Sequence, residues 1–136
     1  MDDVRERCNA IEECYEFMLA FAAQGLPSDE SGGKGSQLRE YMRRGVKALS
    51  GLADAYKAAV KQEGIPSSEP FLVVLERDAM DSRAALEMVL AQPSISSQLI
   101  DNLNASIHLR ALLTDLFLVD EILRPQRVSE NPATTT

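Results

Sequence analysis

Apolar residues recur along most of the chain in alternating steps of four and three, the spacing of helices that bury one face. The first stretch with this spacing predicts a helix over residues 3–24, which Gly25 and Pro27 end. Residues 28–35 combine serine, glycine and charge and predict a flexible loop, because they offer little to bury.

Three further stretches predict helices over residues 37–63, 69–92 and 95–124. Gly64 followed by Pro66 indicates a left-handed cap at the end of the second helix. The polar residues 125–136 predict a disordered tail. Helices of similar length with mostly short connections predict an all-α protein, an antiparallel, up-down-up-down four-helix bundle over residues 1–124. The expected seam of the third helix is Leu72, Leu75, Ala79, Ser82, Leu86 and Val89.

The fourth predicted helix changes its apolar face part-way along. Its first half has a stripe that includes Leu103 and Ile107, whereas the apolar residues of its second half lie on the opposite side. Either the helix bends near residues 108–110 and stays in one core, or a second subunit covers its second half. We favour the second interpretation, a homodimer whose interface contains Leu112, Leu116, Phe117, Val119 and Leu123.

Composition narrows the possible functions without choosing among them. The net charge of −7 disfavours non-specific binding to nucleic acid or to an anionic membrane. No stretch reaches the ~20 apolar residues of a membrane span. The acidic start of the chain does not resemble a signal peptide, so we expect a soluble cytoplasmic protein.

Metal and catalytic motifs of helical proteins are missing from the sequence. A di-metal bundle needs Glu-x-x-His on two helices, and the single histidine, His108, follows Ala105 by three residues. Cys8 and Cys14 lie on or near the seam of the first helix, where a cysteine acts as a small buried apolar residue. We therefore expect no catalytic residue, no metal and no cofactor.

A basic stripe runs along the second predicted helix. Arg39, Arg43 and Lys47 are spaced by four, and Lys57 and Lys61 return to the same side. The stripe is interpreted as a solvated face, with an acidic protein partner as the first alternative and nucleic acid as the second. No aromatic residue interleaves with it, so stacking on a single strand has no support.

Arg110 continues the apolar side of the first half of the fourth helix and is expected to need a carboxylate partner, because a buried unpaired charge is costly. Asp78 is the candidate partner, at the margin of the third seam. The pair is either structural or, together with Tyr56, a ligand site between the helices.

The function that these features favour is a non-enzymatic protein-interaction module, such as a small acidic adaptor or chaperone-like bundle. A small-molecule-binding bundle or enzyme with a site around Arg110 and Asp78 is the alternative. A nucleic-acid binder that uses the basic stripe comes third.

Overall fold

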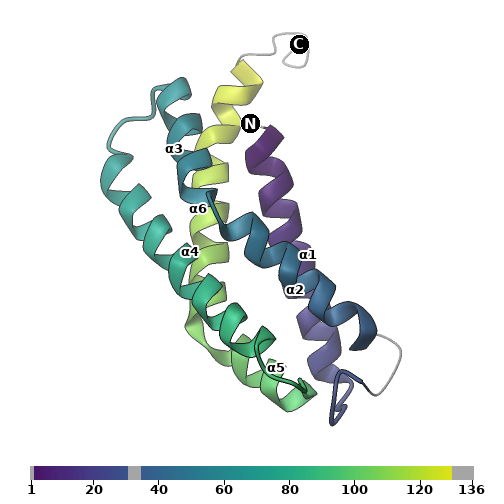
Figure 1. Cartoon of the computed structure of the whole chain (residues 1–136). Coiled ribbons are helices and arrows are strands. Elements are labelled where there is room, and N and C mark those ends of the chain that lie inside the picture. Colours follow the sequence, from purple (N-terminus) through teal and green to yellow (C-terminus); the bar gives the residue numbers. More distant parts are fainter. Residues whose placement is uncertain (1, 31–34, 130–136) are drawn as a thin grey trace.

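The computed structural model describes residues 2–30 and 35–129, and all regular structure in these ranges is helical, with no strand (Figure 1). The all-α prediction is therefore confirmed. The described helices are α1 (Asp2–Ala23), α2 (Gly35–Leu49), α3 (Leu52–Glu63), α4 (Glu69–Leu90), α5 (Ser97–Ala105) and α6 (Ile107–Ser129).

The predicted second helix is in fact two helices. Gly51 adopts a left-handed conformation with φ of 85°, and α3 leaves this point in a direction different from that of α2 (Figure 1). L-residues rarely adopt such a conformation, and glycine does so at little cost. Arg7 of α1 stabilises this break between α2 and α3. Its Nη1 donates to the carbonyl oxygens of Ala48 at 3.0 Å and Ser50 at 2.5 Å.

The predicted fourth helix is also interrupted. Ser106 is extended, with φ of −64° and ψ of 149°, and separates α5 from α6. Its Oγ donates to the carbonyl oxygen of Leu103 at 2.6 Å and so satisfies the end of α5. The bend near residues 108–110, which was the alternative to a homodimer, thus corresponds to a break slightly earlier, and this break reorients the apolar stripe.

The boundary expected before Pro125 is wrong, because α6 continues to Ser129. A proline inside a helix removes one hydrogen bond and bends the helix, but need not end it. The rest of the predicted tail, residues 130–136, lies outside the described residues. None of the described helices combines the length and the apolar content that a membrane crossing requires.

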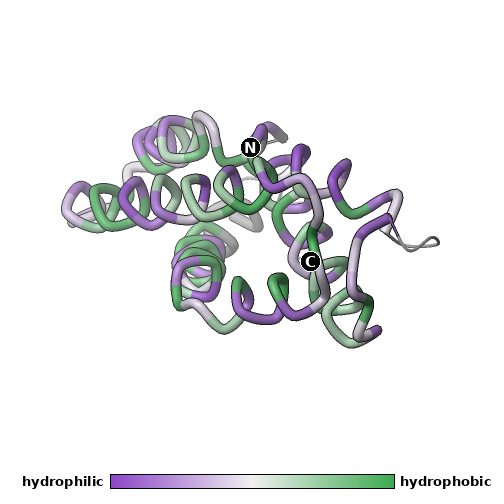
Figure 2. Tube along the Cα trace, turned by 60° about the horizontal axis from the view of Figure 1, so that its bottom comes forward, coloured by the Kyte–Doolittle hydropathy of each residue, from purple (hydrophilic) through white to green (hydrophobic). Residues whose placement is uncertain are grey.

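Buried apolar residues from all six described helices form one core. The core brings α1 against α2 and α5, and α4 against α6 and α2. Along the helices in Figure 2, apolar and polar residues alternate as one buried face requires. The core includes four of the five residues predicted for a dimer interface, Leu112, Leu116, Val119 and Leu123.

The segment after α1 is held by a polar clamp rather than left flexible. The Asp29 carboxylate, in a residue 7% exposed, accepts from Arg39 Nε at 2.7 Å and from the Ile95 amide at 2.8 Å. The Arg39 guanidinium also donates to the carbonyl oxygens of Leu90 and Gln92, both at 2.9 Å. Residues 28–30 of the predicted flexible loop are therefore tied to α2 and to the end of α4, and residues 31–34 lie outside the described ranges.

Candidate functional site

The turn between α3 and α4 folds as its sequence predicts. Gly64 ends α3 with φ of 65°, and its amide donates to the carbonyl oxygen of Lys61. The Ile65 amide donates to the carbonyl oxygen of Val60 at 3.0 Å, which completes the cap that was predicted at this glycine. Ser68 Oγ donates to the Ile65 carbonyl oxygen at 3.1 Å and fixes the chain as it enters α4.

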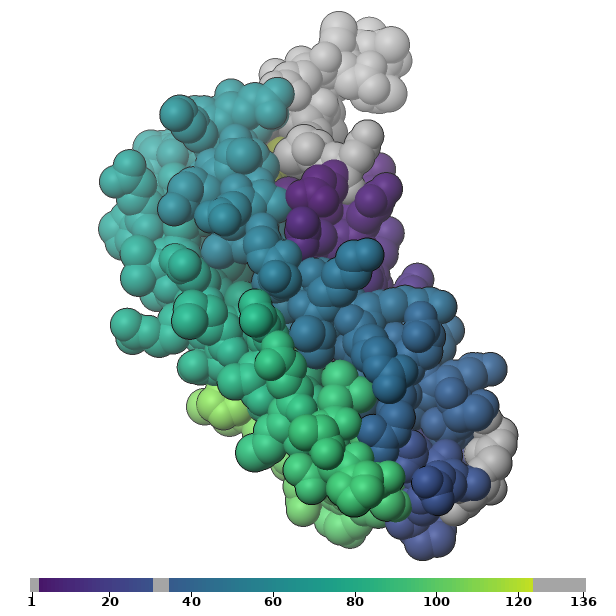
Figure 3. Space-filling view, in the orientation of Figure 1, coloured from purple at the N-terminus to yellow at the C-terminus, as the bar shows by residue number. Residues whose placement is uncertain are grey.

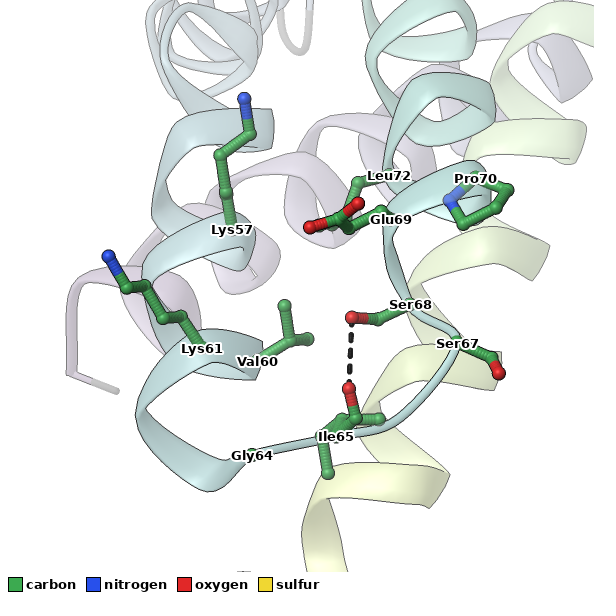
Figure 4. A pocket seen from close by; sticks show the side chains of 10 residues that line it. All are labelled: Lys57, Val60, Lys61, Gly64, Ile65, Ser67, Ser68, Glu69, Pro70 and Leu72. Atoms are coloured by element: carbon green, nitrogen blue, oxygen red, sulfur yellow. Dashed lines mark hydrogen bonds between the residues drawn. The ribbon is translucent and has the colours of Figure 1, made fainter.

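This turn encloses a pocket of about 570 Å³ between the last turns of α3 and the first turn of α4 (Figure 4). Lys57 and Lys61 project from α3, and Glu69 projects from the facing start of α4 (Figure 4). Ser67 and Ser68 belong to the turn that connects α3 to α4. Figure 3 shows the surfaces of α3 and α4 side by side on the face toward the viewer.

A second cavity of about 250 Å³ lies between this turn and α6. Both cavities are lined by Val60, Ile65, Ser67, Ser68 and Leu72. The second adds Phe71 from α4 and Leu118, Val119 and Ile122 from α6. We call these two neighbouring cavities together the corner groove; their walls come from residues 57–72 and from these three residues of α6.

The corner groove is apolar at the α6 end and basic at the α3 end. Leu118 and Ile122 are 50% and 47% exposed, which is high for large apolar side chains. Neither Lys57 nor Lys61 takes part in an ion pair with a described residue. Such a surface can hold an apolar group and a negative charge at the same time.

No protein-family model matches this chain, and no match was found among the curated proteins or the solved structures compared with it. Within the described part of the chain, no three His, Cys, Asp or Glu side chains gather closely enough to hold a metal ion.

The residues of the predicted ligand site have separate surroundings. Arg110 is exposed on α6 and forms no ion pair with a described residue. Asp78 instead lies beside Asp115 of α6, a residue only 8% exposed. Burial, followed by the hydrogen bond and the charge of Asp78, raises the pKa of Asp115 to about 7.

Tyr56 lies in a different contact. It is fully buried, and its hydroxyl donates to Asp120 Oδ1 of α6 at 3.0 Å. Cys8 Sγ of α1 lies 3.0 Å from the same hydroxyl oxygen and donates to it, since the tyrosine proton is already given to Asp120. Burial and then these two neighbours raise the pKa of Tyr56. Asp115 and Asp120 are separated by about 140° around α6, so Asp78 and Tyr56 meet different sides of that helix.

The predicted basic stripe is divided by the break at Gly51. Arg39 is occupied in the clamp with Asp29, whereas Arg43 and Lys47 are exposed on α2. Lys57 and Lys61 lie on α3 and line the corner groove. Of the predicted interface residues, Phe117 alone is exposed, at 57%.

Ile65, Phe71 and Ile122 are groove residues that the sequence did not single out. They come from a turn and two helices, and only the orientation of α6 after the break at Ser106 brings them together. The apolar residue after Gly64 was the one available signal, and it indicated a cap rather than a site.

Proposed function

We propose that this protein is a non-enzymatic interaction module that binds another protein through the corner groove. In this proposal the six described helices act as an antiparallel four-helix bundle, with α2 and α3 as one interrupted rod and α5 and α6 as another. The main support for this function is the apolar wall formed by Leu118 and Ile122, which are about half exposed beside an open cavity. Exposed apolar surface of this kind, with a polar rim, is typical of protein-binding sites.

The chemistry of the groove favours binding over catalysis. No cysteine or histidine lines its two cavities, and both cysteines are buried and form no disulfide bond. Burial raises the pKa of Cys14 to about 12, so this thiol is not a nucleophile at neutral pH. A cytoplasmic location is part of the proposal.

The small volume of the apolar cavity suits the side-chain anchors of a protein partner. At about 250 Å³ it lies below the roughly 300–1,000 Å³ of pockets for drug-sized ligands, whereas the neighbouring cavity of about 570 Å³ lies within that range. A cavity of this size suits one or two side chains, which is how a protein partner anchors itself.

The experiment compares three forms of the chain as bait in extracts of the native host. The groove variant is Leu118→Glu/Ile122→Glu, and the control is Met80→Glu/Met88→Glu on the outer side of α4, where both methionines are exposed but do not line the groove. Circular dichroism first establishes that both variants fold.

We expect one or more proteins to bind the wild-type chain and the control variant and to be lost from the groove variant. A set of bound proteins that is the same for all three forms, or the absence of any bound protein, contradicts the proposed function.

A further inference from the structure

The corner groove joins two different surfaces, and together they restrict what can occupy it. Resting on the proposed function, we infer that the groove takes an acidic segment of the partner protein, in which a large apolar anchor residue is flanked by aspartate or glutamate. The anchor enters the cavity beside α6, and the carboxylates meet Lys57 and Lys61.

The apolar end has the construction of an anchor site. Val60 and Val119, which are 5% and 6% exposed, belong to the core, whereas Leu118 and Ile122 stand about half exposed at the wall. A leucine or phenylalanine placed here covers the exposed halves of these side chains and removes them from water. Buried anchors of this kind supply most of the affinity in small interfaces.

The basic end determines the charge of the occupant. Lys57 and Lys61 lie one helical turn apart on the same side of α3, and Glu69 is the one carboxylate that lines the two cavities. The two cavities are thus lined by two lysines and one glutamate in a chain whose net charge is −7, and Glu76 lines a third cavity that shares Lys57 and Glu69 with the first. The start of α4 adds to this positive character, since a helix N-terminus carries partial positive charge.

Shape argues against a second copy of this chain as the occupant. In a symmetric dimer the same patch lies on both sides of the interface, and a groove on the two-fold axis faces the groove of the other copy. Such a contact joins two concave surfaces. An acidic segment with a projecting anchor satisfies both the shape and the charge.

The test is a selection from a phage-displayed library of random 16-residue peptides on the immobilised full chain. We expect the selected peptides to share a large apolar residue with Asp or Glu within one or two helical turns. One representative is then synthesised with a fluorescein label, and its binding is measured by fluorescence anisotropy.

Two double variants with the same change of charge and the same spacing separate the groove from the rest of the surface. Lys57→Glu/Lys61→Glu lies in the groove, and Arg43→Glu/Lys47→Glu is its matched control on α2. We expect the first to weaken binding about tenfold or more and the second to change it less than about twofold. Leu118→Glu/Ile122→Glu should abolish binding, and thermal unfolding establishes that each variant is folded.

The inference is overturned if no peptides are selected, if they show no acidic enrichment, or if both charge variants weaken binding equally. Its failure can be told apart from a failure of the proposed function. A host protein that needs Leu118 and Ile122 but is retained by Lys57→Glu/Lys61→Glu supports the interaction module and removes the acidic partner. If neither the peptide selection nor the capture of a host protein gives the expected result, both the acidic partner segment and the interaction module are contradicted.

Discussion

At the scale of single residues, the carboxyl pair of Asp78 and Asp115 links protonation to folding. The native pKa of Asp115, about 7, lies above the ordinary value of 3.8. Between these values the folded chain holds a proton that the unfolded chain has released, so stability falls as the pH rises through this range. Above pH 7 the pair holds two negative charges at the contact of α4 and α6, and the resulting loss of folding stability is complete.

We predict that Asp115→Asn raises the free energy of unfolding at pH 8 by about 1–3 kcal/mol and changes it little at pH 5. The amide is neutral at both values and can still donate to Asp78. Urea denaturation at the two pH values measures the effect, with the exposed Asp81→Asn as a control. Equal effects of Asp115→Asn at pH 5 and pH 8 contradict this description of the pair.

The clamp of Asp29 and Arg39 has the opposite dependence on pH. Burial by itself raises the pKa of Asp29, but hydrogen bonds from Arg39 and the Ile95 amide, with the Arg39 charge, outweigh it and lower the pKa. A lowered native pKa gives stability that is present above the ordinary value of 3.8 and is lost as the pH falls through the native pKa.

We predict that Asp29→Ala lowers the free energy of unfolding at pH 7 by about 2–4 kcal/mol, because Arg39 and the Ile95 amide lose their acceptor. Glu40→Ala is the control, since its pair with Arg44 is more than half exposed on both sides. It should cost less than about 0.5 kcal/mol. Chemical denaturation compares the two, and a similar small loss in both variants would show that the clamp contributes little.

At the scale of the elements, the two helix breaks give the chain its shape. The break at Gly51 depends on a backbone conformation, since a Cβ there meets nothing closer than 3.5 Å, at the Arg7 guanidinium. We predict that Gly51→Ala lowers the free energy of unfolding by about 1 kcal/mol, and that the exposed neighbour substitution Ser50→Ala has little effect. Thermal unfolding of both variants decides whether the left-handed conformation is required.

The helices themselves were predictable because packing obeys the same periodicity as the sequence. The buried residues of α4 are the six expected from its spacing, Leu72, Leu75, Ala79, Ser82, Leu86 and Val89. The break at Gly51 was not foreseen, and the break at Ser106 was considered only as the less favoured bend near residues 108–110, because helical spacing continues on both sides and neither break contains a proline. The change of apolar face in the fourth predicted helix results from the break at Ser106, whereas the sequence pattern was interpreted as a homodimer interface.

The candidate site was less predictable than the helices, for a physical reason. Lys57 and Lys61 were recognised as basic neighbours on one face, which follows from local spacing alone. Their position opposite Leu118 and Ile122 depends on how α3 and α6 pack, and both directions are set after the breaks. The expected pairing of Arg110 with Asp78 did not form because α6 presents Asp115 to α4 instead.

At the scale of the whole molecule, most of the apolar surface predicted for a dimer lies in the core of a single chain. With Leu112, Leu116, Val119 and Leu123 in the core of one chain, Phe117, Leu118 and Ile122 are the large apolar residues of α6 left on the described surface near its second half. Stable dimers bury about 1,200–2,000 Å² of total surface, which three side chains do not supply.

We predict that size-exclusion chromatography with light scattering gives the monomer mass of 14.9 kDa at concentrations of tens of micromolar. A mass of twice this value, reduced to the monomer by Phe117→Glu, would restore the homodimer that the sequence predicted. The same change in a monomeric protein should leave both mass and stability nearly unaltered, because Phe117 is exposed.

The hydrogen bond from Tyr56 to Asp120 has a consequence for the thermodynamics of binding. Tyr56 lies one turn before Val60 on α3, and Asp120 follows Val119 on α6, so this bond ties together two walls of the corner groove. Cys8 anchors the same hydroxyl from α1. An arriving partner would meet a cleft whose shape is already set, and its ordering would cost the receptor little conformational entropy.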